Sequence, residues 1–249
     1  MITYVIIEKM KHSSSPVTDG VDNQMYVVDL SGCVSDASSL DDLLDKTRGL
    51  WQSIYERMTD DETLWVIAPN EYQDGRLWPV SMATADFARE ESDLTLKNMI
   101  SLHTWEDRGG DMESAYDEIL FFVRNKREYQ FHKDRIRVSH VYQGHEWGGE
   151  RKEGNSSYHD TSVQRYNSEG KDPGNVWLDE DRTQSDDQSV DQIGPLPMKE
   201  ALRRCVLVGS SEGETVYLVG GDSSFHETVE GDGRVLEVLD IETVRREVA

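Results

Sequence analysis

The stretch LTLKNMISLHTWEDRGGDMESAYDEILFFVRNK, residues 94–126, decides the fold expected for this chain of 249 residues. Its first part alternates, with Leu94, Leu96, Ile100 and Leu102 on one face, which predicts a long, half-buried strand over residues 94–105. The turn EDRGG at residues 106–110 follows. An apolar stripe at helical spacing then predicts a second helix that ends before Arg127; the stripe consists of Met112, Ala115, Tyr116, Ile119, Phe122 and Val123.

The sequence on either side of this stretch predicts further strands and one regular helix. Apolar residues at i, i+3, i+4 and i+7 predict a helix from Leu40 to Met58, with Gly49 inside it. Short β-branched and aromatic runs predict strands at residues 2–7, 24–30, 64–68, 79–86, 136–142 and 158–166. The expected fold class is α+β, with a mostly antiparallel sheet and two main helices.

The last third of the chain differs in composition. Residues 168–198 are polar and rich in loop formers, which predicts a linker or insertion. Beyond it, runs at 204–208, 215–219 and 235–239 with glycines between them, and a short helix at 241–247, predict a small β-rich module. The predicted organisation is therefore an N-terminal β addition (1–37), an α+β core (38–167), the linker (168–198) and this C-terminal module (199–249).

The chain carries 49 acidic and 26 basic side chains, for a formal charge of -23. Such an acidic surface repels itself unless salt screens it, so it favours a protein that works in molar salt; an ordinary acidic cytosolic protein and a DNA mimic are the alternatives. We see no basic stripe, which disfavours binding to nucleic acid through a basic face. No apolar run is long enough for a membrane helix, and no signal peptide is expected. Cys33 and Cys205 are expected to be small buried apolar residues.

The central segments resemble the tail-completion and tail-terminator proteins of tailed viruses, which join head to tail in the neck. The resemblance covers residues 38–167. It is carried by PVSMATADF at 79–87, by the strand–turn–helix stretch above, and by individual residues that match the family pattern: Ile100, Ser101, Leu102, His103, Thr104, Trp105, Arg108, Gly109, Ala115, Ile119, Val123, Arg124, Val163, Arg165 and Tyr166.

This resemblance implies a structural virion protein rather than an enzyme, made in the cytoplasm of a halophilic, archaeal host. It implies a ring, expected to be a homohexamer, on the end of the tail tube. Its partners would be its own copies, the tail tube protein and head connector or stopper proteins. DNA would pass through the lumen without specific binding, and no cofactor or membrane is expected. Whether such a ring ends the tube or joins it to the head is left open by these residues.

The candidate functional residues lie in and around a predicted hairpin loop. Trp147 has two interpretations: it covers local apolar surface, or, together with Arg151 and Lys152, it contacts a neighbouring subunit or the lumen, because aromatic residues with mixed charge are common in interfaces. No metal-ligand spacing occurs, so no metal is expected; if one bound, the first ligands would be His140, His145 and His159. The alternatives to a virion protein are an acidic regulatory or DNA-mimic protein of the cytoplasm and a small metal-dependent hydrolase that uses these histidines. Gly220 and Gly221 are interpreted as a tight turn.

Overall fold

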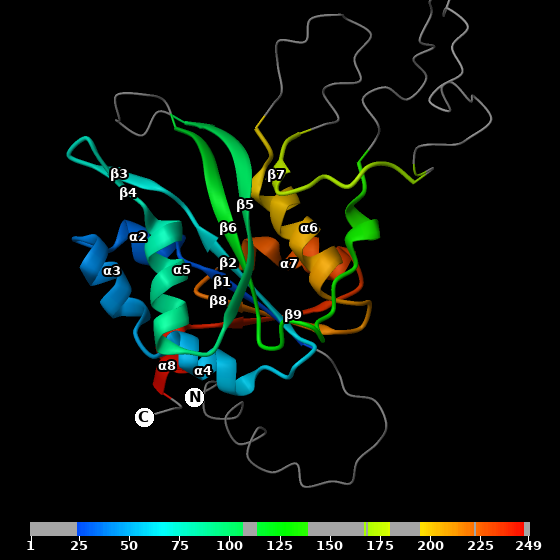
Figure 1. Ribbon diagram of the computed structural model, residues 1–249, viewed down its shortest axis with the longest axis horizontal. Helices are drawn as coiled ribbons and strands as arrows, with labels where there is room; N and C mark the ends of the chain where they lie inside the picture. Colours follow the sequence, from blue (N-terminus) through cyan, green and yellow to red (C-terminus); the bar gives the residue numbers. More distant parts are fainter. Residues whose placement is uncertain are drawn as a thin grey trace, which may run out of the picture.

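The computed structural model describes residues 24–106, 114–138, 167, 169–179, 195–221 and 223–246. Its centre is a seven-stranded sheet in the order β7-β5-β6-β2-β1-β8-β9 (Figure 1). A two-stranded hairpin, β3 (Glu71–Gln73) and β4 (Arg76–Trp78), stands apart from it. The strands of the large sheet are β1 (Gln24–Asp29), β2 (Thr63–Ala68), β5 (Thr95–Glu106), β6 (Ser114–Val123), β7 (Val176–Trp177), β8 (Thr215–Val219) and β9 (Val235–Leu239).

Most neighbouring strands run parallel. The parallel pairs are β1 with β2, β1 with β8, β8 with β9, and β5 with β7, whereas β6 runs antiparallel to both β2 and β5. The carboxyl ends of β1, β2, β8 and β9 therefore meet at one edge of the sheet, which we call the carboxyl edge.

Helices cover both faces of the sheet (Figure 1). One face packs against α3 (Leu40–Thr47), α4 (Leu50–Arg57), α5 (Val80–Glu91) and α8 (Ile241–Arg246), and the other against α6 (Met198–Gly209) and α7 (His226–Gly231). Short helical turns complete the described chain: α2 (Ser31–Ser35), η1 (Lys133–Ile136) and η4 (Ser223–Phe225). Every residue of β2 is buried, and all of them except Thr63 are apolar, as is usual for a central strand that is covered on both faces.

The structure confirms several predicted elements. Strands occur to within one residue of the ranges predicted at 24–30, 64–68, 94–105, 215–219 and 235–239, and the helix predicted at 241–247 is α8. The helix predicted from Leu40 to Met58 is present as two helices, α3 and α4. The break lies at Gly49, whose φ of 78° is in the left-handed region that favours glycine.

The structure confirms the predicted mixture of helices and strands, but the sheet is mostly parallel, so the prediction of a mostly antiparallel sheet is correct only for the pairs that β6 makes. The prediction of two main helices is wrong. Its largest error is the second helix, because residues 114–123 form strand β6. Ile119 pairs with Ile67 of β2 on one side and Ile100 of β5 on the other, so both edges of β6 are hydrogen-bonded. The run from Ile119 to Val123 is also buried on both faces of the sheet. A continuous apolar run of this kind shows neither the period of two of a half-buried strand nor the period of 3.6 of an amphipathic helix, so the sequence does not distinguish the two.

Two predicted strands are helices. The range 79–86 belongs to α5, which starts after Pro79 and buries Val80, Thr84 and Ala88 at helical spacing. The range 204–208 belongs to α6, which follows Pro197 and buries Ala201, Leu202, Cys205 and Val208. In both segments the buried residues recur at helical spacing, and this packing outweighs the preference of valine and threonine for strands.

Three further predictions concern the ends of the described ranges. The strand predicted at 136–142 is not seen in the described part of that range: Ile136 ends η1, and Val138 forms only an isolated bridge with Lys171. The strands predicted at 2–7 and 158–166 lie outside the described residues.

Strands β8 and β9, which the sequence assigns to a C-terminal module, continue the same sheet as β1.

Candidate functional site

The candidate site lies at the carboxyl edge, between the ends of β1 and β8. From this point the chain leads outward in opposite directions, from β1 to β2 on one side and from β8 through α7 to β9 on the other. In open sheets of this type, ligands bind outside the carboxyl ends of the strands where the strand order reverses. The topology therefore directs attention to the residues that follow β1, β8 and β9.

The turn after β8 lies beside the acidic residue that follows β9. The backbone N–H of Gly220 donates to the carbonyl of Leu239 at 2.9 Å, which carries the β8–β9 ladder one residue past the strand. Asp240 comes next and is exposed; its Oδ2 accepts from the N–H and the hydroxyl of Thr243, both at 3.3 Å, and so caps α8. A glycine turn followed about 20 residues later by an acidic residue, after the next strand, is the arrangement that holds the ribose of a nucleotide in doubly wound folds.

The end of β1 closes on the same turn. Leu30 N–H donates to Ile67 of β2 at 3.1 Å, and Asp29 Oδ1 accepts from Ser31 N–H at 2.9 Å, at the start of α2. A β-carbon on Gly220 would stand 2.8 Å from the Asp29 carbonyl oxygen and 2.7 Å from Ile241 Cδ1. Gly220 also has a φ of 80°. Glycine is thus required at this position for β1, β8 and α8 to meet.

Two further carboxylates lie near the end of β2. Asp117 is 4% exposed, and its Oδ1 accepts from the N–H of Asn70 at 3.0 Å. On the opposite face of β6, Glu118 accepts from the hydroxyl of Ser81 in α5. These bonds hold the loop after β2 and the start of α5 against the sheet, so we assign both carboxylates to structure.

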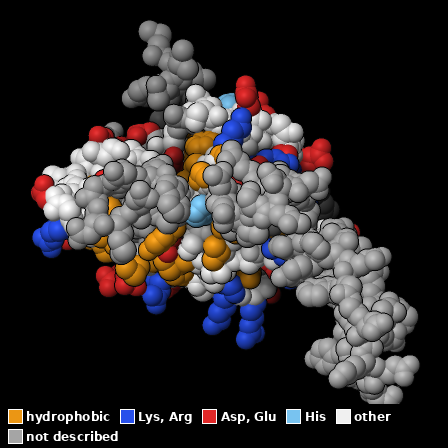
Figure 2. All heavy atoms as spheres, turned by 90° about the horizontal axis from the view of Figure 1, so that it is seen from above, with side chains coloured by type: hydrophobic (Ala, Val, Ile, Leu, Met, Phe, Trp, Pro, Cys, Tyr) orange, Lys and Arg blue, Asp and Glu red, His pale blue; other side chains and the backbone are white. Residues whose placement is uncertain are grey.

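Hydrophobic side chains gather around the middle of the face that is seen from above in Figure 2, with acidic and basic side chains toward its margin. The exposed large hydrophobic residues of the elements next to the end of β2 are Leu77, Met82 and Tyr116. Such residues offer apolar contact to a planar group held at the carboxyl edge.

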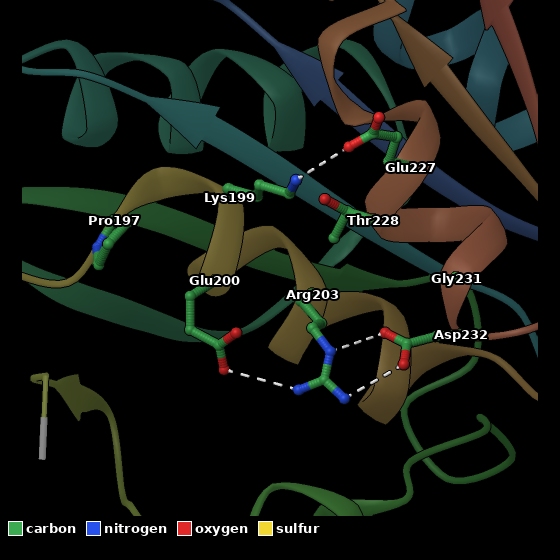
Figure 3. Close-up of a pocket in the computed structure, with 8 residues that line it drawn as sticks. All are labelled: Pro197, Lys199, Glu200, Arg203, Glu227, Thr228, Gly231 and Asp232. Carbon is green, nitrogen blue, oxygen red and sulfur yellow. Dashed lines mark hydrogen bonds and ion pairs between the residues drawn. The ribbon is translucent and has the colours of Figure 1, made fainter. Parts of the chain in front are cut away.

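A separate depression lies between α6 and α7 (Figure 3). Arg203 crosses it to Asp232 through two contacts, Nε to Oδ2 at 2.9 Å and Nη2 to Oδ1 at 3.1 Å. Lys199 Nζ lies 3.7 Å from Glu227 Oε2. Both of these cations already face carboxylates on the opposite side of the depression, so we assign these ion pairs to holding α6 and α7 together.

The site residues suggested by the sequence lie elsewhere. Trp147, Arg151 and Lys152, and the histidines His140, His145 and His159, fall outside the described residues. Within the described ranges, no group of three His, Cys, Asp or Glu side chains is placed to hold a metal ion. Cys205 is buried as expected and Cys33 is half-buried, and both are free thiols. No helix of the described chain has the length and apolar character needed to cross a membrane.

Comparison with known families decides the class of protein. A family model for DNA methylases of the N6/N4 methyltransferase type matches residues 11–217, which is most of the chain. The chain belongs to this DNA methylase family. No curated protein matches it.

Solved structures of DNA methylases share the fold. A DNA modification methylase of Thermus thermophilus has 14% sequence identity and a TM-score of 0.52, over 95% of this chain and 88% of that one. The same methylase in complex with S-adenosyl-L-methionine has 13% identity and a TM-score of 0.51, over 95% and 87%. The cytosine-N4-specific PvuII DNA methyltransferase has 8% identity and a TM-score of 0.56, over 90% and 80%.

These findings overturn the functional predictions from the sequence. The family is one of DNA methylases, so the resemblance to tail-completion and tail-terminator proteins was wrong. The same findings contradict the predicted location in the virion neck and the predicted ring with its tail tube and head connector partners. They also contradict the expectation that the protein is not an enzyme. The DNA-mimic and metal-dependent hydrolase alternatives do not match the family either.

The residues that sequence reasoning missed are Gly220, Asp240 and Asp29. The glycine pair was read as a turn, and Asp240 as one acidic residue among many. The signal that could have found them is their order: a β-run, a glycine pair, a helix, a second β-run and then an acidic residue 20 positions after the first glycine.

Proposed function

We propose that this chain transfers a methyl group from S-adenosylmethionine to an exocyclic amino group of a DNA base. The proposal rests on one observation, the juxtaposition of the Gly220 turn and Asp240 at the carboxyl edge of a fold shared with DNA methylases. The N6/N4 type of the matching family supports an amino nitrogen as the acceptor.

The residues at the edge suit the chemistry of this cofactor. Asp240 is exposed, and a carboxylate accepts hydrogen bonds from the two hydroxyls of a ribose. The Gly220–Gly221 turn leaves backbone rather than side chain over the end of β8. The nearby Asp29 and Asp240 carboxylates also favour a positively charged sulfonium group, whereas a phosphate-bearing cofactor would be repelled.

Asp29 is the residue best placed to orient the acceptor amine. Its Oδ1 is held by Ser31 N–H, and within the described residues its Oδ2 makes no hydrogen bond, so Oδ2 is available to an amino N–H. Such a bond would direct the nitrogen lone pair away from Asp29, and the carboxylate could receive the proton that the amine loses. When bound, S-adenosylmethionine would supply the electrophilic methyl group.

The acceptor base has to leave the DNA stack to reach this edge. Enzymes that modify a base inside a duplex extrude it into a pocket lined by apolar and aromatic side chains. Leu77, Met82 and Tyr116 offer such contacts next to the end of β2. We therefore assign this part of the carboxyl edge to the base and the β8–β9 part to the cofactor.

Isothermal titration calorimetry with S-adenosylmethionine tests the cofactor half of the proposal. Asp240→Asn keeps the cap on α8, because Asn caps helices as well as Asp does, but it removes the charge. We expect this variant to bind roughly 10-fold or more weakly, the usual effect of losing a charged hydrogen-bond acceptor. Glu242→Gln, an exposed neighbour on α8, is the matched control and should bind as the wild type does. Equal binding by Asp240→Asn and the wild type would contradict the assignment.

A further inference from the structure

The segment that follows β6 reverses the charge of the chain. Residues 124–137 hold six basic side chains and two acidic ones, whereas the whole chain has a net charge of -23. The segment starts where Val123 pairs with Thr63 and Thr95, the first residues of β2 and β5. It therefore begins at the edge of the sheet opposite the candidate active site. The sequence-based expectation that the chain has no basic stripe overlooked this segment.

Several of these cations are used inside the fold. Arg124 donates to the carbonyls of Tyr55 and Met58, and Arg135 donates to the carbonyl of Ser210 at 2.6 Å. Lys126 and Arg127 are different: both are exposed, and within the described residues neither side chain makes a hydrogen bond or ion pair. Two cations are thus left for a partner.

Aromatic rings stand beside the available cations. Lys97 Nζ donates to the carbonyl of Lys126 at 3.2 Å and lies 4.9 Å from the centre of the Tyr129 ring. The Tyr129 ring in turn lies 6.1 Å from that of Phe131. These contacts join Lys97, Lys126, Tyr129 and Phe131. With the exposed Arg127, which follows Lys126 in the chain, they define the surface that we call the basic–aromatic patch.

Phe131 is held in place but not covered. Its ring stacks on Phe121 at 5.4 Å between centroids, and Phe121 is buried and stacks on Trp65 at 4.3 Å. Phe131 nevertheless remains 42% exposed. An apolar ring fixed from beneath and open outward is poorly explained by packing alone, but it is suited to stack on another flat ring.

We propose that the basic–aromatic patch binds single-stranded DNA. Exposed Lys and Arg side chains bind the phosphates, and an exposed aromatic ring stacks on a base, which is the combination used by proteins that bind single strands. A duplex offers only its phosphates to such a surface, because its bases are already stacked. The strong negative charge elsewhere repels DNA, so contact at this patch is favoured over the rest of the described surface.

The proposal goes beyond methyl transfer, since the patch is remote from the Gly220 turn, and only the choice of DNA rests on the family. The patch would hold a strand, or the unpaired part of a duplex, while the opposite edge carries out the chemistry.

Fluorescence anisotropy of a labelled oligo-dT strand, measured over a salt series without S-adenosylmethionine, tests the proposal. Lys126→Glu with Arg127→Glu should reduce the slope of log affinity against log salt by about 1.4, which corresponds to two phosphate contacts of a single strand. Phe131→Ala should lower affinity about 10-fold for the single strand and leave binding to a matched duplex unchanged. Arg89→Glu with Lys199→Glu makes the same change of charge on exposed residues of α5 and α6 and should have a much smaller effect.

The outcomes separate this proposal from the proposed function. The Lys126→Glu, Arg127→Glu variant should still bind S-adenosylmethionine, and Asp240→Asn should still bind the strand. The patch would be rejected if the two charge-reversal pairs reduced strand binding equally, or if Phe131→Ala left it unchanged. Failure of cofactor binding alone would reject the methyl transfer and leave the patch standing.

Discussion

Gly220 donates its backbone N–H to Leu239, and this 2.9 Å bond places the turn after β8 directly against the residue that ends β9. The bond explains how two positions 20 residues apart come to form one site, since Asp240 follows Leu239 immediately. It also explains why the turn is glycine, because α8 starts here and its Ile241 side chain occupies the space that a β-carbon of Gly220 would need.

Replacing Gly220 with alanine should destabilise the protein strongly. The φ of 80° is strained for alanine, and the new β-carbon would lie 2.8 Å from the backbone carbonyl oxygen of Asp29, which cannot move freely. We expect the free energy of unfolding in urea to fall by about 2–4 kcal/mol. Gly213→Ala is the control, because Gly213 has a φ of 87° but open space around it, and it should cost only about 1 kcal/mol. Equal losses for the two variants would show that the close packing at Gly220 is not as described.

Phe121 and Phe122 should matter equally for stability. They face opposite sides of the sheet and are 3% and 0% exposed, whereas a helix over this segment would place Phe121 outside its apolar stripe. We expect alanine at either position to lower the free energy of unfolding by about 3–5 kcal/mol. Phe131→Ala, at an exposed position, should cost less than about 1 kcal/mol in the same urea titration. A small loss for Phe121→Ala alone would favour the helix.

Acid should destabilise the region around His132. Its Nε2 lies 2.8 Å from Gln130 Nε2 and 3.2 Å from Ser211 Oγ, so the neutral ring serves as the acceptor. Burial lowers the pKa of His132, and the nearby Arg135 adds to the effect. Because the folded state resists protonation, this contribution is present above the ordinary pKa of histidine and is lost as the pH falls through the folded value. Urea titrations at about pH 7.5 and 5 should show a larger loss for the wild type than for His132→Gln; equal losses would contradict this role.

The sequence predicts the strands whose two faces differ, and fails where both faces are buried. In β5 the apolar Ile100 and Leu102 alternate with polar residues, so the period of two is visible there. The prediction that Leu94 and Leu96 share their face is wrong, because a register shift between Leu96 and Asn98 places them on the opposite face of the sheet. In β6 the run from Ile119 to Val123 is apolar throughout, and only the neighbouring β2 and β5 make it a strand. Parallel pairing is likewise invisible in the local sequence, because it depends on where the crossover helices return the chain.

The candidate site is less visible still. Asp29, Gly220 and Asp240 are brought together by pairing between strands that begin almost 200 residues apart, and no local pattern reports such contacts. The acidity of the chain concealed it further, since 49 carboxylates make any one of them inconspicuous. The spacing from Gly220 to Asp240 was the one readable signal, and the separate module assigned to residues 199–249 kept it from being connected to β1.

Methylation of DNA by the purified chain is the most direct test of the proposed function. Purified protein should be incubated with unmethylated DNA and S-adenosylmethionine carrying an isotope-labelled methyl group, and the digested nucleosides analysed by mass spectrometry. We predict labelled N6-methyladenine or N4-methylcytosine from the wild type and little from Asp29→Asn, whose amide still accepts the Ser31 hydrogen bond but cannot take up the proton. Absence of any labelled base from the wild type, under conditions where calorimetry shows that it binds the cofactor, would contradict the proposed function.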